Sequence, residues 1–183
     1  MPMQFSGINL YDVRKKCEDP PLCYNFTLVT DYLHQPSVVE ALGTKGHPWS
    51  DCNRLVDMVM VYAGDWMKNF QNDVEFVLDQ GHRVLIYAGE YDFICNWMGN
   101  DAWTRTFDWS GKAAFAAATN KTWTTEAGNA AGSFRAAKGT STTGSLTFLK
   151  VWNAGHMVPR DQPENALDMV NRHLQNLPFG DDE

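Results

Sequence analysis

Apolar residues recur at helical spacing in the segment "DWMKNFQNDVEFVLDQG". This spacing predicts a helix over residues 65–81, in which Asp65 caps the start and Gly81 ends the last turn. The run Val84–Tyr87 follows at once and is apolar throughout, which is typical of a strand buried on both faces of a sheet. The apolar positions of the predicted helix are Trp66, Phe70, Val74, Val77 and Leu78.

A hairpin and an amphipathic helix are predicted near the carboxyl terminus. The segments "GSFRAAK" and "SLTFLKV" flank the turn-rich "GTSTTG", a pattern that indicates two paired strands. Pro163 and Glu164 suit the first turn of a following helix, which Pro178 and Gly180 are expected to end. The apolar residues of that helix form one stripe, at Ala166, Leu167, Val170, Leu174 and Leu177.

The first sixty or so residues predict turns and short helices, with no sign of a sheet. A helix is expected to begin after the capping residue Thr30 or Asp31, to be interrupted at Pro36, and to resume as far as Gly43.

Two residues able to do acid–base chemistry follow predicted strands. Asp92 lies just past the strand 84–87, and His156 just past the second strand of the hairpin. Open α/β sheets gather their sites at such strand ends, so these two side chains could face each other. An aspartate that accepts a hydrogen bond from one imidazole nitrogen leaves the other nitrogen free to act as a general base. The alternative is that Asp92 caps a turn and His156 is a partly buried structural histidine.

The order of Asp before His matches the second half of the Ser, Asp, His order of α/β-hydrolases, but the Gly-x-Ser-x-Gly nucleophile elbow is not in this sequence. Ser141 in "GTSTT" lacks the second glycine and has the setting of a turn residue. Cys95 is three residues from Asp92, a carboxylate that should raise the thiol pKa and so weaken it as a nucleophile. The sequence therefore predicts half of a catalytic site.

Composition and charge argue against several classes of function. With 183 residues, 44% of them hydrophobic and 20% charged, the chain has the composition of a soluble globular protein. A formal net charge of -7 argues against a nucleic-acid or anionic-membrane partner, and the apolar runs are too short to span a bilayer. The five histidines are scattered, and neither a metal motif nor a glycine-rich phosphate loop occurs, so we expect no metal and no cofactor.

The cysteines and glycosylation motifs indicate the secretory pathway. Cys17 and Cys23 bracket the proline-containing loop "CEDPPLC", which a disulfide could close. Asn25 and Asn120 begin Asn-x-Thr sequons, which are modified in secreted proteins. The opening "MPMQFSGINL" has neither the basic start nor the long apolar core of a leader, so we expect the natural polypeptide to begin upstream and this chain to be a fragment.

Four long motifs carry a family resemblance: "YDVRKKCEDPPLCY", "AGDWMKNF", "VLIYAGEYDFICNWMGN" and "NAGHMVPRDQPENALDMVNRHL". Together they resemble the carboxyl-terminal part of serine carboxypeptidases of the carboxypeptidase Y and cathepsin A group. The resemblance implies the carboxyl-terminal part of an α/β-hydrolase fold, with residues 1–64 in a mostly helical cap insertion and residues 65–183 in the core. It also implies removal of carboxyl-terminal residues from peptides or proteins through an acyl-enzyme, best at acidic pH.

Roles for individual residues follow from this resemblance. His156 would be the general base and then the general acid, and Asp92 would orient it. The expected pocket residues are Trp66, Ile94 and Cys95 on the acyl side of the cleaved bond, and Met157, Tyr11 and Tyr24 on the side of the departing residue. A tryptophan in an amphipathic helix or a tyrosine beside a cysteine loop can equally be a packing residue. Cys95 would be a free thiol, with Cys17 and Cys23 paired.

The resemblance also implies a missing part. Cys52, in "SDCN", resembles a cysteine that pairs with the amino-terminal half of the family fold, so we expect as partner an amino-terminal half or a large chain that carries the serine. The isolated chain should be inactive, and its unpaired sheet edge should favour aggregation. The implied location is the lysosome or vacuole, or outside the cell. The alternatives are a family relative that acts as an acyltransferase or lyase, and a non-catalytic chain that binds or chaperones another protein.

Overall fold

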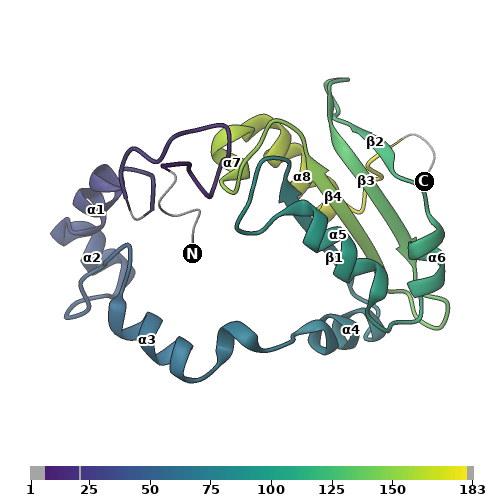
Figure 1. The fold of residues 1–183 in the computed structure, drawn as a ribbon, viewed down its shortest axis with the longest axis horizontal. Coiled ribbons are helices and arrows are strands. Elements are labelled where there is room, and N and C mark those ends of the chain that lie inside the picture. The colour runs from purple at the N-terminus through teal and green to yellow at the C-terminus, as the bar shows by residue number, and fades with distance from the viewer. Residues whose placement is uncertain (1–6, 21, 181–183) are drawn as a thin grey trace. The chain divides into compact units, whose positions relative to one another are not determined.

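The computed structural model describes residues 7–20 and 22–180, which form two compact units (Figure 1). The larger unit contains residues 7–16 and 70–180, and the smaller unit contains residues 17–20 and 22–69. The predicted boundary after residue 64, between cap insertion and core, stays a prediction. No helix among the described residues is long and apolar enough to cross a membrane.

The larger unit is built on a mixed four-stranded sheet with the order β1-β4-β3-β2 (Figure 1). β1 (Arg83–Gly89) runs parallel to β4 (Ser145–Val151), with Gly89 opposite Val151 at the carboxyl end. β4 pairs antiparallel with β3 (Ala130–Lys138), which confirms the predicted hairpin. β2 (Lys121–Thr124) pairs antiparallel with β3 and was not predicted.

Helices cover both faces of this sheet because β4 alternates apolar side chains between them. Leu146 and Phe148 face one side, and Leu149 and Val151 face the other. The first side packs against α4 (Gln71–Asp79), α5 (Trp97–Thr106) and α6 (Lys112–Ala117). The second side packs against α7 (Val158–Asp161) and α8 (Pro163–Gln175). A mixed sheet with helices on both faces is an α/β arrangement, as predicted.

The helix predicted over residues 65–81 is wrong in its first half. A 3-10 turn, η2 (Asp65–Met67), is followed by extended backbone at Lys68, and the regular helix α4 begins only at Gln71. Trp66 and Phe70, which completed the apparent apolar stripe, are 70% and 53% exposed, so no packing supports a continuous helix there.

The prediction that β1 is buried on both faces is also wrong for the described chain. β1 is an edge strand of the sheet, and its residues Val84 to Ile86 are only half-buried, while Tyr87 is 44% exposed. An apolar run indicates a strand that can be buried, but it does not show whether the strand lies inside the sheet or at its edge.

α8 begins with Pro163 in its first turn, as predicted, but ends earlier than predicted. Asn176 adopts the left-handed conformation with φ 57° and terminates the helix before Leu177. Ala166 and Met169 are the buried residues of α8. The rest of the predicted apolar stripe is 45–69% exposed: Leu167, Val170, Leu174 and Leu177.

The smaller unit contains three short helices and a disulfide. Pro36 separates α1 (Thr27–Leu33) from α2 (Pro36–Leu42), and Gly43 ends α2 in the left-handed conformation, as predicted. α1 begins at Thr27, before the predicted capping residues Thr30 and Asp31, and the Thr27 amide donates a hydrogen bond to Asn25 Oδ1 just before the helix. α3 (Arg54–Tyr62) was not predicted individually. The disulfide between Cys17 and Cys23 is confirmed.

Candidate active site

Two loops at the carboxyl ends of β1 and β4 are held together by backbone contacts. Tyr91 N and Glu90 N donate hydrogen bonds to Ala154 O and Val151 O, each at 2.9 Å. Gly89 packs so closely on the Ala154 and Gly155 carbonyls that a Cβ atom has no room there. The parallel pairing of β1 with β4 therefore delivers Asp92 and His156 to the same place.

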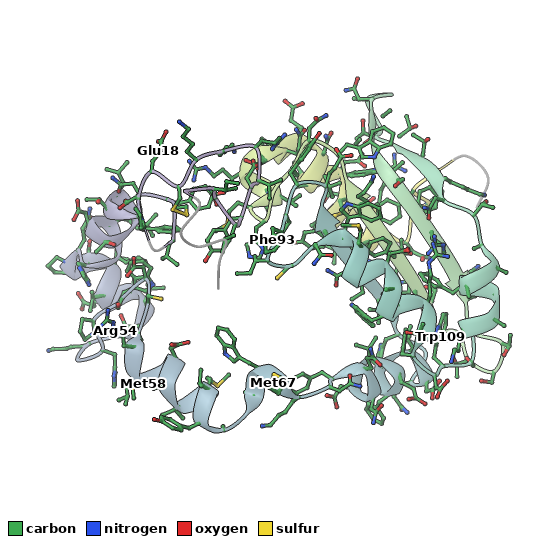
Figure 2. All side chains as sticks on the ribbon, in the orientation of Figure 1. Glu18, Arg54, Met58, Met67, Phe93 and Trp109 are labelled. Atoms are coloured by element: carbon green, nitrogen blue, oxygen red, sulfur yellow. A yellow bond between two sulfur atoms is a disulfide. The ribbon has the colours of Figure 1, made fainter. Side chains whose placement is uncertain are left out.

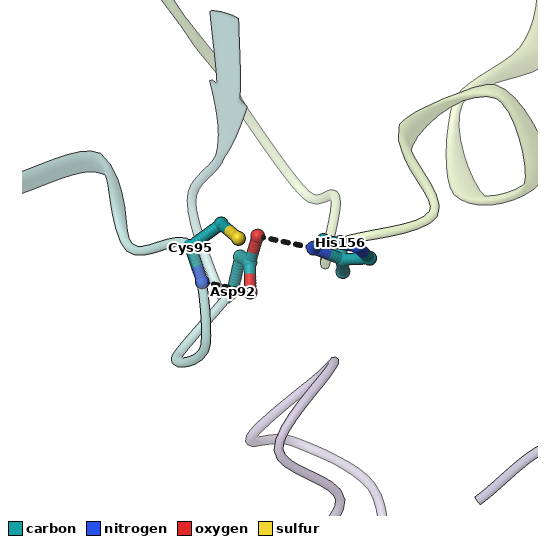
Figure 3. Close-up of side chains that lie close together, drawn as sticks. All are labelled: Asp92, Cys95 and His156. Atoms are coloured by element: carbon teal, nitrogen blue, oxygen red, sulfur yellow. Dashed lines mark hydrogen bonds and ion pairs between the residues drawn. The ribbon is translucent and has the colours of Figure 1, made fainter. Parts of the chain in front are cut away.

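Asp92 and His156 form a hydrogen-bonded pair (Figure 3). His156 Nδ1 lies 2.9 Å from Asp92 Oδ2, and because a carboxylate can only accept, the proton sits on Nδ1. Asp92 Oδ1 accepts a second hydrogen bond, from Cys95 N at 3.1 Å. The aspartate side chain is 4% exposed and the histidine side chain 34%. A fixed Nδ1 tautomer leaves Nε2 as a proton acceptor, which is the arrangement of a general base.

Cys95 lies beside this pair, and its thiol chemistry is suppressed. Partial burial, and then the charge of Asp92, raise the pKa of the Cys95 thiol. Asp92, Cys95 and His156 present ligand-type atoms within 4.8 Å of one another. The Asp92–His156 hydrogen bond already engages His156 Nδ1 and Asp92 Oδ2. The arrangement therefore suits proton transfer by His156 better than attack by Cys95.

Three further predicted pocket residues lie around the pair in the larger unit. The rings of Tyr11 and His156 have centroids 5.3 Å apart, and Tyr11 O accepts a hydrogen bond of 2.7 Å from His156 N. Ile94 is 50% exposed and lies in the Asp92 loop. Met157 follows His156 directly and is partly buried. Their contacts with a substrate remain predictions.

Trp66 and Tyr24 belong to the smaller unit, so their predicted pocket roles stay predictions. Trp66 is exposed, whereas Tyr24 is buried beside Phe26, with ring centroids 6.5 Å apart. Cys52 is exposed and forms no disulfide with any described residue. The sequon residues Asn25 and Asn120 are both exposed, as glycosylation requires.

Sequence reasoning missed the polar residues that support the pair. Asp12 is fully buried next to the His156 loop, and Lys15 reaches Asp161 beyond that loop. The only signal for them was the charge pattern in "YDVRKK", where one acidic residue precedes three basic ones. That pattern alone is equally typical of an exposed charged turn.

Comparisons with known proteins agree on one family. The family model described as "Serine carboxypeptidase" matches residues 2–176. Carboxypeptidase Y of Candida albicans is 46% identical over 174 residues, which cover 94% of this chain and 31% of that protein. Carboxypeptidase Y of Komagataella phaffii is 42% identical over 174 residues, which cover 94% of this chain and 32% of that protein. The chain thus spans about a third of the length of these relatives.

The fold is also found in a solved structure. The crystal structure of Kex1Δp, a prohormone-processing carboxypeptidase from Saccharomyces cerevisiae, matches with a TM-score of 0.73 and 22% sequence identity. The match covers 96% of this chain and 38% of that one.

Proposed function

This chain belongs to the serine carboxypeptidase family, and we propose that it supplies the Asp92–His156 half of the catalytic triad of a serine-type carboxypeptidase. Such an enzyme releases residues from the carboxyl termini of peptides or proteins through an acyl-enzyme. The observation that carries the proposal is the 2.9 Å contact between His156 Nδ1 and Asp92 Oδ2 at the carboxyl ends of two parallel strands.

In the proposed mechanism His156 transfers protons in both directions. Nε2 takes the proton of the serine hydroxyl as the serine attacks the scissile carbonyl, and the resulting imidazolium is stabilised by the buried Asp92 carboxylate. The imidazolium then gives the proton to the leaving amine. In the second half-reaction the same nitrogen activates the water that releases the acyl group.

The serine would come from outside the sequence described here, from an upstream part of the same polypeptide or from a separate large chain. This chain covers only about a third of the length of its relatives, which supports this proposal. The exposed thiol of Cys52 also supports it, because that thiol is free to pair with another segment. Without the serine, rate losses on the order of a million-fold are typical of such triads, so the isolated chain should be inactive.

The proposed location is the secretory pathway, ending in a lysosome or vacuole or outside the cell. The Cys17–Cys23 disulfide supports it, because such bonds persist in oxidising compartments. Exposed sequons at Asn25 and Asn120 suit the same route. Treatment of the purified protein with an endoglycosidase should lower its mass. An unchanged mass would contradict the proposed glycosylation.

Substitution of the pair in the whole protein tests the proposed reaction. With an amino-blocked dipeptide as substrate, His156→Ala should lower kcat/KM about a million-fold, and Asp92→Asn about ten-thousand-fold. His82→Ala is the matched control, because His82 is an exposed histidine of the same unit. Activity of His156→Ala close to that of the control would refute the proposed function.

Measuring the mass of the natural protein with and without reductant tests where the catalytic serine lies. Release of a larger chain containing Gly-x-Ser-x-Gly would support a two-chain enzyme linked through Cys52. One longer chain, unaffected by reductant, would support a single-chain carboxypeptidase. Recovery of the short chain alone would contradict a catalytic role.

A further inference from the structure

Residues 7–16 form a loop that closes on itself, which we call the clamp loop. Ile8 and Lys16 form an isolated antiparallel bridge, and Asn9 N donates to Lys15 O at 2.9 Å. Inside the loop, the buried Asn9 side chain accepts a hydrogen bond of 2.8 Å from Tyr11 N. The loop therefore has a defined internal structure before its contacts with the catalytic loops are counted.

Asp12 lies fully buried at the centre of the clamp loop. Its two carboxylate oxygens accept hydrogen bonds from Arg14 Nε at 2.8 Å and Arg14 Nη2 at 2.7 Å, and Lys15 Nζ lies 3.0 Å from Oδ2. Burial by itself raises the pKa of Asp12, but the hydrogen bonds from Arg14 and Lys15 outweigh burial and lower it to about 2. The carboxylate thus stays charged across the acidic range in which the proposed enzyme would work.

One side of the clamp loop binds the loop that carries Asp92. Val13 N donates to Tyr91 O at 3.1 Å, and Leu10 O accepts hydrogen bonds from Phe93 N and Ile94 N, each at 3.2 Å. These backbone bonds bracket Asp92 on both sides in the sequence. The Arg14 guanidinium adds a contact over the Tyr91 ring, 4.2 Å from its centroid.

The other side binds the loop that carries His156. Tyr11 O accepts a hydrogen bond from His156 N itself, at 2.7 Å. Gly155 packs against Tyr11 O and the Asp12 side chain without room for a Cβ atom. Beyond the loop, Lys15 Nζ lies 3.1 Å from Asp161 Oδ1, while Asp161 Oδ2 accepts a hydrogen bond of 2.8 Å from Gly155 N.

We propose that the clamp loop is a positioning element of the active site, which sets the geometry of the Asp92–His156 pair by holding both catalytic loops at once, with Lys15 and Asp161 as positioning residues. The proposal rests on the proposed function. Neither residue touches the reacting atoms. Both act through Gly155, whose amide hydrogen bond to Asp161 orients the backbone just before His156. Displacements of about 1 Å can cost on the order of a hundred-fold in rate, so loss of this support should lower kcat.

Kinetics of Lys15 and Asp161 variants in the whole protein test the proposal. Per active site, counted by titration with a serine-directed phosphonate, Asp161→Asn should lower kcat about tenfold and Lys15→Met about threefold, with KM changed less than about twofold. Lys15→Arg should restore most of the rate, because guanidinium can also bind Asp161. Lys138→Met is the matched control, since Lys138 is an exposed lysine of the same unit that pairs with Ser145 at the other end of β4.

A double variant and a spectroscopic signal separate positioning from simple destabilisation. If Lys15 acts through Asp161, the pair Lys15→Met/Asp161→Asn should be no slower than Asp161→Asn alone. The low-field proton resonance of His156 Nδ1 should shift in Asp161→Asn and stay in place in Lys138→Met. Unchanged kcat per titrated site together with an unmoved resonance in Asp161→Asn would overturn the proposal. Retained activity in His156→Ala would instead overturn the proposed function.

Discussion

The two units differ in where their apolar side chains lie. In the larger unit, Leu78, Phe115, Trp123 and Leu149 have no exposed surface and form two clusters on opposite faces of the sheet. In the smaller unit, α1, α2 and α3 contain no buried residue, and Tyr24 is the sole buried residue among the described positions from 17 to 69. Figure 2 shows the side chains of α3, among them Arg54 and Met58, and Met58 is 51% exposed.

This difference separates local folding from support by a core. α3 has a good capping residue in Asn53, whose side chain accepts hydrogen bonds from Leu55 N and Val56 N, and yet its apolar residues are 41–85% exposed. A helix that is apolar on all sides normally lies buried. The smaller unit therefore buries little apolar surface of its own, whereas the larger unit builds two apolar clusters on the sheet that carries the Asp92–His156 pair.

Glycine substitutions should show the largest contrast between the units. Gly89→Ala would push a methyl group into the Ala154 and Gly155 carbonyls and force the two catalytic loops apart, so we expect a loss of about 3 kcal/mol or more and no measurable activity in the whole protein. Gly43→Ala meets no atom within 4 Å and should cost only about 1 kcal/mol, from its φ of +67°. Thermal melting and activity would measure both variants. Equal losses of stability in the two variants would contradict the difference between the two units.

Leucine truncations should give the next largest contrast. Leu149→Ala removes a fully buried side chain from β4, and we expect it to lower the free energy of unfolding by about 2–5 kcal/mol. Leu55→Ala, at a position 71% exposed, should cost less than about 0.5 kcal/mol. Urea unfolding of the 183-residue chain, kept dilute to limit its expected aggregation, would measure both. A large cost for Leu55→Ala would mean that the smaller unit has a core of its own.

Removal of the disulfide should affect only the smaller unit. For a loop as short as the one closed by Cys17 and Cys23, chain-entropy arguments give about 2 kcal/mol. In Cys17→Ser/Cys23→Ser, amide hydrogen exchange should accelerate in α1 and α2 and remain unchanged in β3 and β4. Equal acceleration in both units would contradict their independence.

Lowering the pH should produce the smallest change in stability, and this change should arise in the larger unit alone. The pKa of Asp12 is lowered from 3.8 to about 2, so its stabilisation is fully present above pH 4 and is lost as the pH falls through about 2. Urea midpoints measured between pH 5 and pH 2 should therefore fall more steeply at the acidic end in the parent than in Asp12→Asn. Parallel curves would show that this carboxylate adds no pH-dependent stability.

Periodic segments were predictable, and irregular ones were not. The β3–β4 hairpin and the start of α8 follow from alternation and from Pro163, and the pairing of Asp92 with His156 follows from their places after two strands. The break before α4 was missed because Trp66 and Phe70 have helical spacing without a core to pack on. Spacing reports a possible apolar face, whereas only tertiary contacts decide whether that face is used.

The clamp loop was beyond sequence reasoning for a different physical reason. Its role depends on partners far along the chain: Arg14 donates a hydrogen bond to Asn153 O, and Lys15 donates one to Asp161 Oδ1. Locally, the segment has neither helical nor strand periodicity. A buried aspartate such as Asp12 also runs against the expectation for its residue type, and only its two cationic neighbours make the burial possible.

The span of these contacts has a consequence for biosynthesis. Arg14 and Asn153 are 139 positions apart, and Lys15 and Asp161 are 146 positions apart. During translation the clamp loop is therefore made well before Asn153 and Asp161, and contacts of such separation form slowly. A nascent polypeptide that has not yet added residues 153 to 161 therefore carries the clamp loop without its contacts to the His156 loop.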